Sequence, residues 1–189
     1  MNIEEKTITE MDGERHLVKS DSKGEKFPVV DEEGNVLDSM TRSEAHSGTK
    51  RLHPVVHLHV FNSKGELYLQ HRADWKEVQP DKWDTATGGH VDYGETVYEA
   101  LQREVYEEIG LRPDMYEPVL KKKYVYESAI ERELVYVFTT QYDGELYPSA
   151  TETTGGKFWP ISKIRDNIGI GVFTPMFEKE VKAMGFLDE

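Results

Sequence analysis

Three glutamates in one short segment are the residues of this chain best suited to chemistry. Glu104, Glu107 and Glu108 stand at positions i, i+3 and i+4, so a helix would hold their side chains on one face. Like charges this close repel one another, and a cation is needed to compensate them. Carboxylate oxygens are hard ligands that suit Mg²⁺ or Mn²⁺. The spacing therefore predicts a divalent-metal site on a helix.

Start and stop signals predict the helix that positions these glutamates. Thr96 followed by Glu99 has the form of a capping box, which satisfies the free amides of a helix start. Gly110 is typical of the residue that ends a helix. Before the helix, the glycine-rich residues 88–94 predict a tight loop in which the backbone can approach a ligand closely. The face opposite the acids carries apolar residues at helical spacing, namely Val97, Ala100, Leu101 and Val105.

The full spacing of residues 89–111 resembles the Nudix box, Gly-x5-Glu-x7-Arg-Glu-U-x-Glu-Glu-x-Gly-U, in which U is aliphatic. Every defined position matches. The resemblance implies hydrolysis of a nucleoside diphosphate linked to another moiety, with Mg²⁺ or Mn²⁺ as cofactor. It also implies that Glu104, Glu107 and Glu108 bind the metal, that one of them acts as the base, and that Gly89 offers its backbone carbonyl.

Two further box residues, Arg103 and Glu95, are expected to support catalysis. The resemblance implies that Arg103 orients the glutamates by ion pairing and that Glu95 braces the loop against the helix. A purely structural salt bridge is the alternative for this pair. Many members of the family recruit another glutamate from outside the box, and the candidates here are Glu152, Glu131 and Glu133, although an isolated acid is more often a surface residue.

A second resemblance is to the type I isopentenyl-diphosphate isomerases, which share the Nudix fold. His46 and His53 have the His-x6-His spacing of that family, and Glu131 and Glu133 match its acidic pair. With His90, these residues imply a second divalent-metal or substrate site.

One departure from the isomerases matters for function. Gly88 stands where the isomerases carry a reactive cysteine, and this chain has no cysteine. Moving protons at an allylic carbon needs an acid and a base on opposite faces, and glycine supplies neither. The complete box and the missing cysteine favour a hydrolase of the isomerase-like branch, and an isomerase-like enzyme is the alternative.

Several other polar and aromatic residues fit either a role in the site or a structural role. His57 and His59 alternate with apolar residues of a strand, which favours structural or pocket-wall roles. Arg72 and Lys76 resemble the substrate-side segment of isomerase-like members, where basic groups meet a diphosphate; a solvated loop is the alternative. Aromatic side chains near a cleft either stack on a base or pack the loop, and the candidates are Trp75, Trp83 and Tyr93.

Composition narrows the classes of partner. The formal net charge of −13 disfavours nucleic acid and anionic membranes, because both attract positive charge. The expected partner is a small-molecule diphosphate, and a cytoplasmic location is expected. No apolar run reaches the length of a membrane span. The sequence leaves the oligomeric state open, with the N-terminal strands as a candidate edge for a homodimer.

The pattern of elements predicts a Nudix-type α/β/α sandwich with a mixed sheet, an N-terminal β-hairpin extension and a C-terminal helix. Residues 1–24 are expected to form a polar, partly ordered arm, and residues 25–189 a single Nudix domain. Strands are predicted at 27–31, 36–38, 55–61, 67–72, 119–126, 133–142 and 158–159, and helices at 42–46, 161–166 and 174–184. A non-catalytic ligand sensor on the same scaffold is a further alternative, although such domains generally lose box glutamates.

Overall fold

The computed structural model describes residues 8–11, 14–17, 24–76, 78–151 and 153–188. Its main sheet has seven strands: β5 (His53–Phe61), β6 (Leu67–Arg72), β7 (Trp83–Asp84), β8 (Thr87–His90), β9 (Val119–Glu127), β10 (Arg132–Gln141) and β11 (Thr153–Trp159). Five strands follow the order β11-β6-β5-β10-β9, while β7 pairs with β6 and β8 pairs with β5. Strand β10 is parallel to β5, and the other pairings are antiparallel. The predicted mixed sheet is confirmed.

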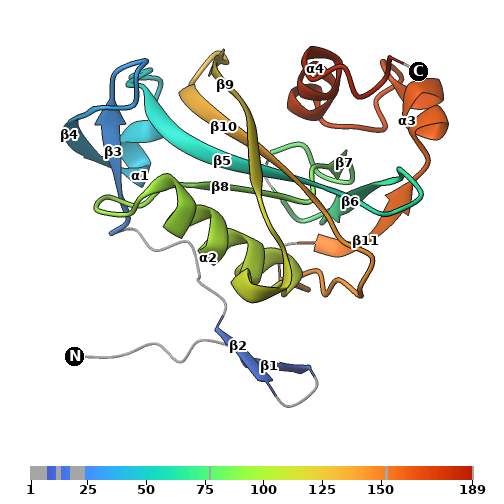
Figure 1. Cartoon of the computed structure of the whole chain (residues 1–189). Helices are drawn as coiled ribbons and strands as arrows, with labels where there is room; N and C mark the ends of the chain where they lie inside the picture. The colour runs from blue at the N-terminus through green and yellow to red at the C-terminus, as the bar shows by residue number, and fades with distance from the viewer. Residues whose placement is uncertain (1–7, 12–13, 18–23, 77, 152, 189) are drawn as a thin grey trace.

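Helices cover both faces of this sheet, which confirms the predicted sandwich (Figure 1). The helices are α1 (Arg42–Ala45), α2 (Val97–Ile109), the 3-10 turn η1 (Pro113–Met115), α3 (Ile161–Asn167) and α4 (Pro175–Ala183). Helix α2 lies on one face, and α3 and α4 lie on the other. Among the described residues, no helix combines the length and apolar character that a membrane span requires.

The side chains of β5 alternate between the two faces of the sheet, so this central strand contributes to the core on both sides. Val56, Leu58 and Val60 are fully buried and pack in the core that includes α2. Val55 points to the opposite face, where Met176 of α4 packs against it and its neighbours. Because successive side chains of a strand alternate between its faces, His53, His57 and His59 share the α4 face with Val55.

Helix α2 has the predicted ends. The side chain of Thr96 accepts a hydrogen bond from the backbone N–H of Glu99, and the Glu99 carboxylate accepts one from the Thr96 N–H. Gly110 closes the helix with φ of 67°, in the left-handed region that favours glycine. The capping box and the glycine therefore set where the helix begins and ends, and its buried residues are Ala100, Leu101, Val105 and Ile109.

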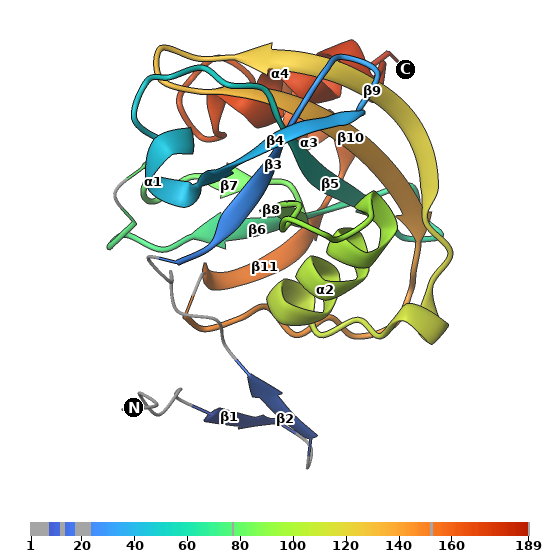
Figure 2. The ribbon, with the colours of Figure 1, turned by 90° about the vertical axis from the view of Figure 1, so that its left-hand side faces the viewer.

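A hairpin of β3 (Lys26–Val30) and β4 (Val36–Thr41) precedes the sheet, as predicted, and α1 follows it (Figure 2). Its buried Phe27 stacks on His90 with ring centroids 4.3 Å apart. The backbone carbonyl of Lys26 accepts a hydrogen bond from the N–H of Tyr93. The hairpin is thus attached to the glycine-rich segment that leads into α2.

The structure differs from the sequence-based prediction in the bounds of several elements, and β7 and η1 were not predicted. Residues 87–90 form strand β8 instead of a loop, because pairing with β5 overrides the low strand propensity of glycine. Strand β11 begins at Thr153, five residues before the predicted start, because β6 supplies a partner there. Ahead of the hairpin, β1 (Ile8–Met11) and β2 (Glu14–Leu17) form a small separate sheet.

Candidate active site

Strand β8 separates two groups of polar side chains. A Cβ atom at Gly89 would collide with the Glu104 carboxylate on the α2 face. A Cβ atom at Gly88 would instead lie 3.2 Å from Cδ2 of His57, on the α4 face. His90 shares the α4 face with Gly88, since alternate residues of a strand point the same way. One four-residue strand therefore borders two candidate sites.

Arg103 connects helix α2 to the segment before it. Its Nε and Nη2 atoms each donate to a carboxylate oxygen of Glu95 at 2.8 Å. Its Nη1 donates to Glu104 at 2.5 Å, and Nη2 also donates to the carbonyl oxygen of His90 at 3.0 Å. Glu95 in turn accepts from the backbone N–H of Asp92 at 3.0 Å. These contacts have the geometry that orienting and bracing roles require.

Of the other two box glutamates, Glu108 contacts strand β8 and Glu107 lies beside Arg103. The Oε2 atom of Glu108 accepts from the Gly88 N–H and from the Gln70 side-chain amide, both at 3.2 Å. Glu107 lies 3.7 Å from the Arg103 guanidinium. The glutamates offer carboxylate oxygens, which are hard ligands, and the absence of a Cβ at Gly89 lets Glu104 approach the backbone of β8. Both features fit a hard divalent cation.

Replacing Gly89 by alanine is expected to reduce activity without unfolding the protein. The new methyl group would displace the Glu104 carboxylate from its place against β8. We expect kcat to fall roughly tenfold or more, because about 1.4 kcal/mol of lost transition-state stabilisation suffices for that. Steady-state kinetics and thermal melting would check this. Gly24→Ala is the matched control, since a Cβ there meets nothing within 4 Å.

The α4 face holds a compact set of metal-ligating groups. The ligand atoms of His53, His90 and Glu133 all lie within 4.8 Å of one another. Within the part of the chain that the structure describes, this is the one group of three or more such residues that meets this distance, and the box glutamates do not. Strand pairing explains the convergence, because Glu133 of β10 is aligned with His53 of β5.

Hydrogen bonds fix which imidazole nitrogens remain available at this cluster. Nδ1 of His46 bonds the Glu131 carboxylate at 2.7 Å, and Nδ1 of His53 bonds the carbonyl oxygen of Arg51 at 3.0 Å. Both partners only accept, so each Nδ1 carries the proton and a neutral ring keeps its lone pair on Nε2. The Nε2 atoms of His46, His53 and His90 are buried without a hydrogen-bond partner.

Electrostatics at this cluster also suit a cation. Burial lowers the pKa of His53 and lowers that of His90 well below its ordinary value, which favours the neutral rings that bind metal. Burial and the neighbouring Glu131 raise the pKa of Glu133 to about 7. The hydrogen bond from His46 is the largest cause of the lowered pKa of Glu131. The buried imidazole lone pairs and the two neighbouring carboxylates together fit a divalent ion.

His57 and His59 lie deeper on the same face and share one carboxylate. Glu180 of α4 is 1% exposed and accepts from Nδ1 of His57 at 2.9 Å, from Nε2 of His59 at 2.6 Å and from the Tyr124 hydroxyl at 2.6 Å. Burial alone would lower the pKa of His57, but the Glu180 charge outweighs it and raises that pKa to about 9. The network holds a buried positive charge beside Gly88.

This ion pair predicts a loss of stability at alkaline pH. The pKa of His57 is about 9 in the folded state against an ordinary 6.5, so its contribution is complete below pH 6.5 and disappears as pH rises through 9. Such a shift corresponds to roughly 3 kcal/mol. Urea unfolding between pH 6 and 10 would measure this, and His57→Gln should remove most of the alkaline slope. An equal slope in both proteins would contradict the assignment.

The remaining predicted residues have separate places. Arg72 donates to the carbonyls of Val78 and Gln79 and lies 3.6 Å from Asp84, so it is bound within the β6–β7 connection, which also contains Lys76. The other candidates are distributed as follows: Trp83 packs against Trp159, Trp75 and Tyr93 are exposed, and Glu152 lies outside the described residues.

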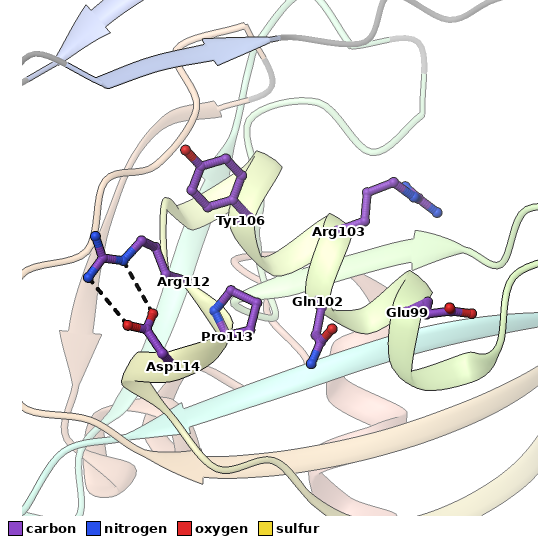
Figure 3. A pocket seen from close by; sticks show the side chains of 7 residues that line it. All are labelled: Glu99, Gln102, Arg103, Tyr106, Arg112, Pro113 and Asp114. Carbon is purple, nitrogen blue, oxygen red and sulfur yellow. Dashed lines mark hydrogen bonds and ion pairs between the residues drawn. The ribbon is translucent and has the colours of Figure 1, made fainter.

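An open groove of about 710 Å³ runs along the outer side of α2 (Figure 3). Figure 3 shows Arg112 paired with Asp114 at one end, while Arg103 and Glu99 lie along the helix. The residues lining the groove are Glu99, Gln102, Arg103, Tyr106, Arg112, Pro113 and Asp114. Only Arg103 among them belongs to the predicted site, so the groove borders the box, and Glu104, Glu107 and Glu108 do not line it.

Sequence reasoning missed Glu180 and Gln70. Glu180 lies more than 120 residues from its histidine partners, and no motif connects them. One signal was present: Phe177, Glu180 and Val181 share the buried side of α4, so a carboxylate stands among apolar positions. Gln70 stands in a strand that alternates as expected, with nothing to mark its contact with Glu108.

Known proteins resemble this chain in sequence and in fold. A Nudix hydrolase of Listeria monocytogenes is 44% identical over 64 residues, which cover 34% of this chain and 38% of that protein. An isopentenyl-diphosphate Delta-isomerase 1 of Photorhabdus laumondii is 29% identical over 82% of this chain and 92% of its own length. The solved structure of DR0079 from Deinococcus radiodurans has a TM-score of 0.74 at 22% identity, over 85% of this chain and 99% of that one, which shows a shared fold.

The lengths of these matches support a statement about the family of the chain but not about its activity. The chain spans about two fifths of the length of the Listeria hydrolase and about half that of a Nudix hydrolase from Nostoc. Both resemblances inferred from the residues, to Nudix hydrolases and to the isomerases, recur among the relatives. A family model described as the NUDIX domain matches residues 51–176, and this chain therefore belongs to the NUDIX domain family.

Proposed function

We propose that this protein is a Mg²⁺-dependent hydrolase that cleaves the pyrophosphate bond of a nucleoside-diphosphate derivative or a related organic diphosphate. The observation that carries the proposal is the arrangement of three glutamates on α2: Glu104 and Glu108 lie against the glycines of β8, and Glu107 lies beside Arg103. Relatives described as Nudix hydrolases support it.

Each box residue has a part in this proposal. Glu104, Glu107 and Glu108, together with the Gly89 carbonyl, would hold a divalent ion, and one glutamate would take a proton from the attacking water. When bound, such an ion would offset the diphosphate charge and make the attacking water more acidic. Arg103 orients Glu104 through their ion pair, and Glu95 fixes Arg103 in turn. No basic surface is needed to attract the anionic substrate.

A substrate panel with product identification tests this proposal. The purified protein is incubated with nucleoside-diphosphate derivatives and organic diphosphates, with and without Mg²⁺, and phosphorus NMR identifies the broken bond. Metal-dependent cleavage of a pyrophosphate bond is expected. A folded, metal-loaded protein that cleaves no member of the panel would count against the function.

The cluster of His46, His53, His90, Glu131 and Glu133 favours a second candidate, an isopentenyl-diphosphate isomerase that works without cysteine. Relatives named as isomerases support it. Gly88 opposes it, because a glycine provides no group that can protonate or deprotonate carbon. Exchange of protons into isopentenyl diphosphate in D₂O separates the two functions. We expect no exchange, and measurable exchange would favour the isomerase.

The two candidate metal sites are expected to be separable by mutation. His90→Gln removes a ligand from the α4-face cluster and leaves the glutamates of the other face in place. We expect Mn²⁺ titration to lose one bound ion per chain in this variant, while Glu107→Gln loses the other. Isothermal titration with Mn²⁺ measures both. Identical stoichiometry in His90→Gln and the parent protein would refute a second site.

A further inference from the structure

Gln70 is a buried amide of which only one end is hydrogen-bonded. It lies on β6, is 7% exposed, and donates from Nε2 to Oε2 of Glu108 at 3.2 Å. A carboxylate only accepts, so the amide nitrogen, and not the amide oxygen, faces Glu108. The amide oxygen is buried and has no hydrogen-bond partner among the described residues. Because a buried acceptor without a partner lowers stability, folding alone does not explain this side chain.

The contact between Gln70 and Glu108 lies where two strands separate. Strand β5 pairs with β6 at Phe61 and Leu67, and with β8 along residues 55–58. Among the described residues, β6 and β8 are not paired with each other. The Oε2 atom of Glu108 accepts one hydrogen bond from each strand, from Gln70 of β6 and from the Gly88 N–H of β8. Glu108 therefore bridges the two strands.

The backbone holds Gln70 firmly on the face that carries the box glutamates. Strand β6 is paired on both sides at this residue, with Gly156 of β11 and with Asp84 of β7. Tyr68, two residues earlier on the strand, packs in the core that includes α2. Since residues i and i+2 of a strand share a face, Gln70 also points toward α2. The donor to Glu108 thus stands on a rigid element.

We propose that Gln70 is a positioning residue of the box metal site, and that its amide fixes the orientation in which the Glu108 carboxylate meets the ion. The inference rests on the proposed function, in which Glu108 is a metal ligand. Ligating carboxylates are themselves held by hydrogen bonds from residues that do not touch the metal, and these partners strongly affect metal affinity. The Gly88 N–H supplies a second such bond from the backbone.

A neutral amide suits this role better than a cation would. Arg103 already donates to Glu104 and lies 3.7 Å from Glu107. A further cation at position 70 would offset negative charge that attracts a divalent ion. The amide of Gln70 instead orients Glu108 without adding a positive charge of its own.

Metal binding by a Gln70→Met variant tests the proposal without turnover. Methionine resembles glutamine in length but donates no hydrogen bond. Isothermal titration with Mn²⁺ compares the variant with the parent protein, and the box ion is the one that Glu107→Gln removes. We expect the Kd of this ion to rise about 10- to 100-fold, as the loss of a residue that orients a ligand predicts. Gln141→Met, at the exposed end of β10, is the matched control and should keep the parent Kd.

Thermal melting in EDTA separates positioning from a structural role. Gln70→Met removes the buried amide oxygen that has no partner, so the variant should melt at the temperature of the parent protein or above it. A purely structural amide would give the reverse result, a lower melting temperature with an unchanged Kd for Mn²⁺. That combination would overturn the proposal.

Nuclear magnetic resonance of the parent protein keeps the proposal testable if Gln70→Met does not fold. The side-chain amide resonances of Gln70 should shift on addition of Mg²⁺, and those of Gln141 should not. Unmoved Gln70 resonances, or an unchanged Kd in the folded variant, would overturn the positioning role even if the parent protein cleaves a diphosphate. Weaker metal binding by Gln70→Met, without cleavage of any diphosphate by the parent protein, would instead show that only the hydrolase function is wrong.

Discussion

Replacing Glu107 by glutamine is expected to lower kcat by roughly a thousandfold or more, because a metal ion supplies several kcal/mol of charge stabilisation in the transition state. Glutamine has nearly the same shape as glutamate but lacks its charge. Glu107 is partly exposed and lies 3.7 Å from the Arg103 guanidinium, so its loss leaves the helix core unchanged. The expected result is a folded protein with almost no turnover.

The measurement is steady-state kinetics at saturating Mg²⁺ on the substrate that the panel identifies. Glu117→Gln, an exposed carboxylate shortly after α2, is the matched control and should retain full activity. Circular dichroism and thermal melting check that both variants fold. Undiminished turnover in Glu107→Gln would remove this glutamate from the catalytic set. Its loss of turnover would also exclude a ligand sensor without catalysis, since a sensor has no turnover to lose.

Replacing Glu180 by alanine is expected to destabilise the protein by roughly 3–5 kcal/mol, because removing one partner of a buried pair leaves the others uncompensated. The carboxylate is 1% exposed and accepts hydrogen bonds from His57, His59 and Tyr124. Alanine leaves these three donors without an acceptor and opens a cavity between α4 and the sheet. A loss of this size is a large part of the stability of an ordinary domain.

Urea unfolding monitored by tryptophan fluorescence at pH 7 measures this loss. Lys182→Ala on the exposed side of the same helix is the control and should change the free energy of unfolding by less than about 0.5 kcal/mol. A Glu180→Ala protein as stable as the control would mean that the network contributes nothing to folding. Because Glu180 lies on α4, outside the box, no analysis of the box alone would predict this effect.

Local sequence signals predicted the elements that carry the box. Thr96 and Glu99 fixed the start of α2 and Gly110 fixed its end, and the alternation of β5 separated Val56, Leu58 and Val60 from the histidines. These signals act over a few residues, through capping, backbone conformation and strand alternation. They can therefore be read without knowing what the element packs against.

Such local signals cannot predict which strands pair when they lie far apart in the sequence. Residues 87–90 have the composition of a loop, yet β5 recruits them as β8, and the two faces of that strand then define both candidate sites. Glu133 reaches His53 because β10 lies parallel to β5 at that register, and Glu180 reaches His57 because α4 folds back over the sheet.

The sequence by itself determined the family, the helix that carries the box and the identity of nearly every candidate ligand, since these follow from residue types at fixed local spacing. Only the tertiary structure decided which of them converge. It brought ligand atoms of His53, His90 and Glu133 within 4.8 Å of one another, and it placed the His57 imidazole beside Gly88. The reason is physical: the geometry of a site depends on contacts between segments far apart in the chain, and those contacts are selected by packing of the whole core.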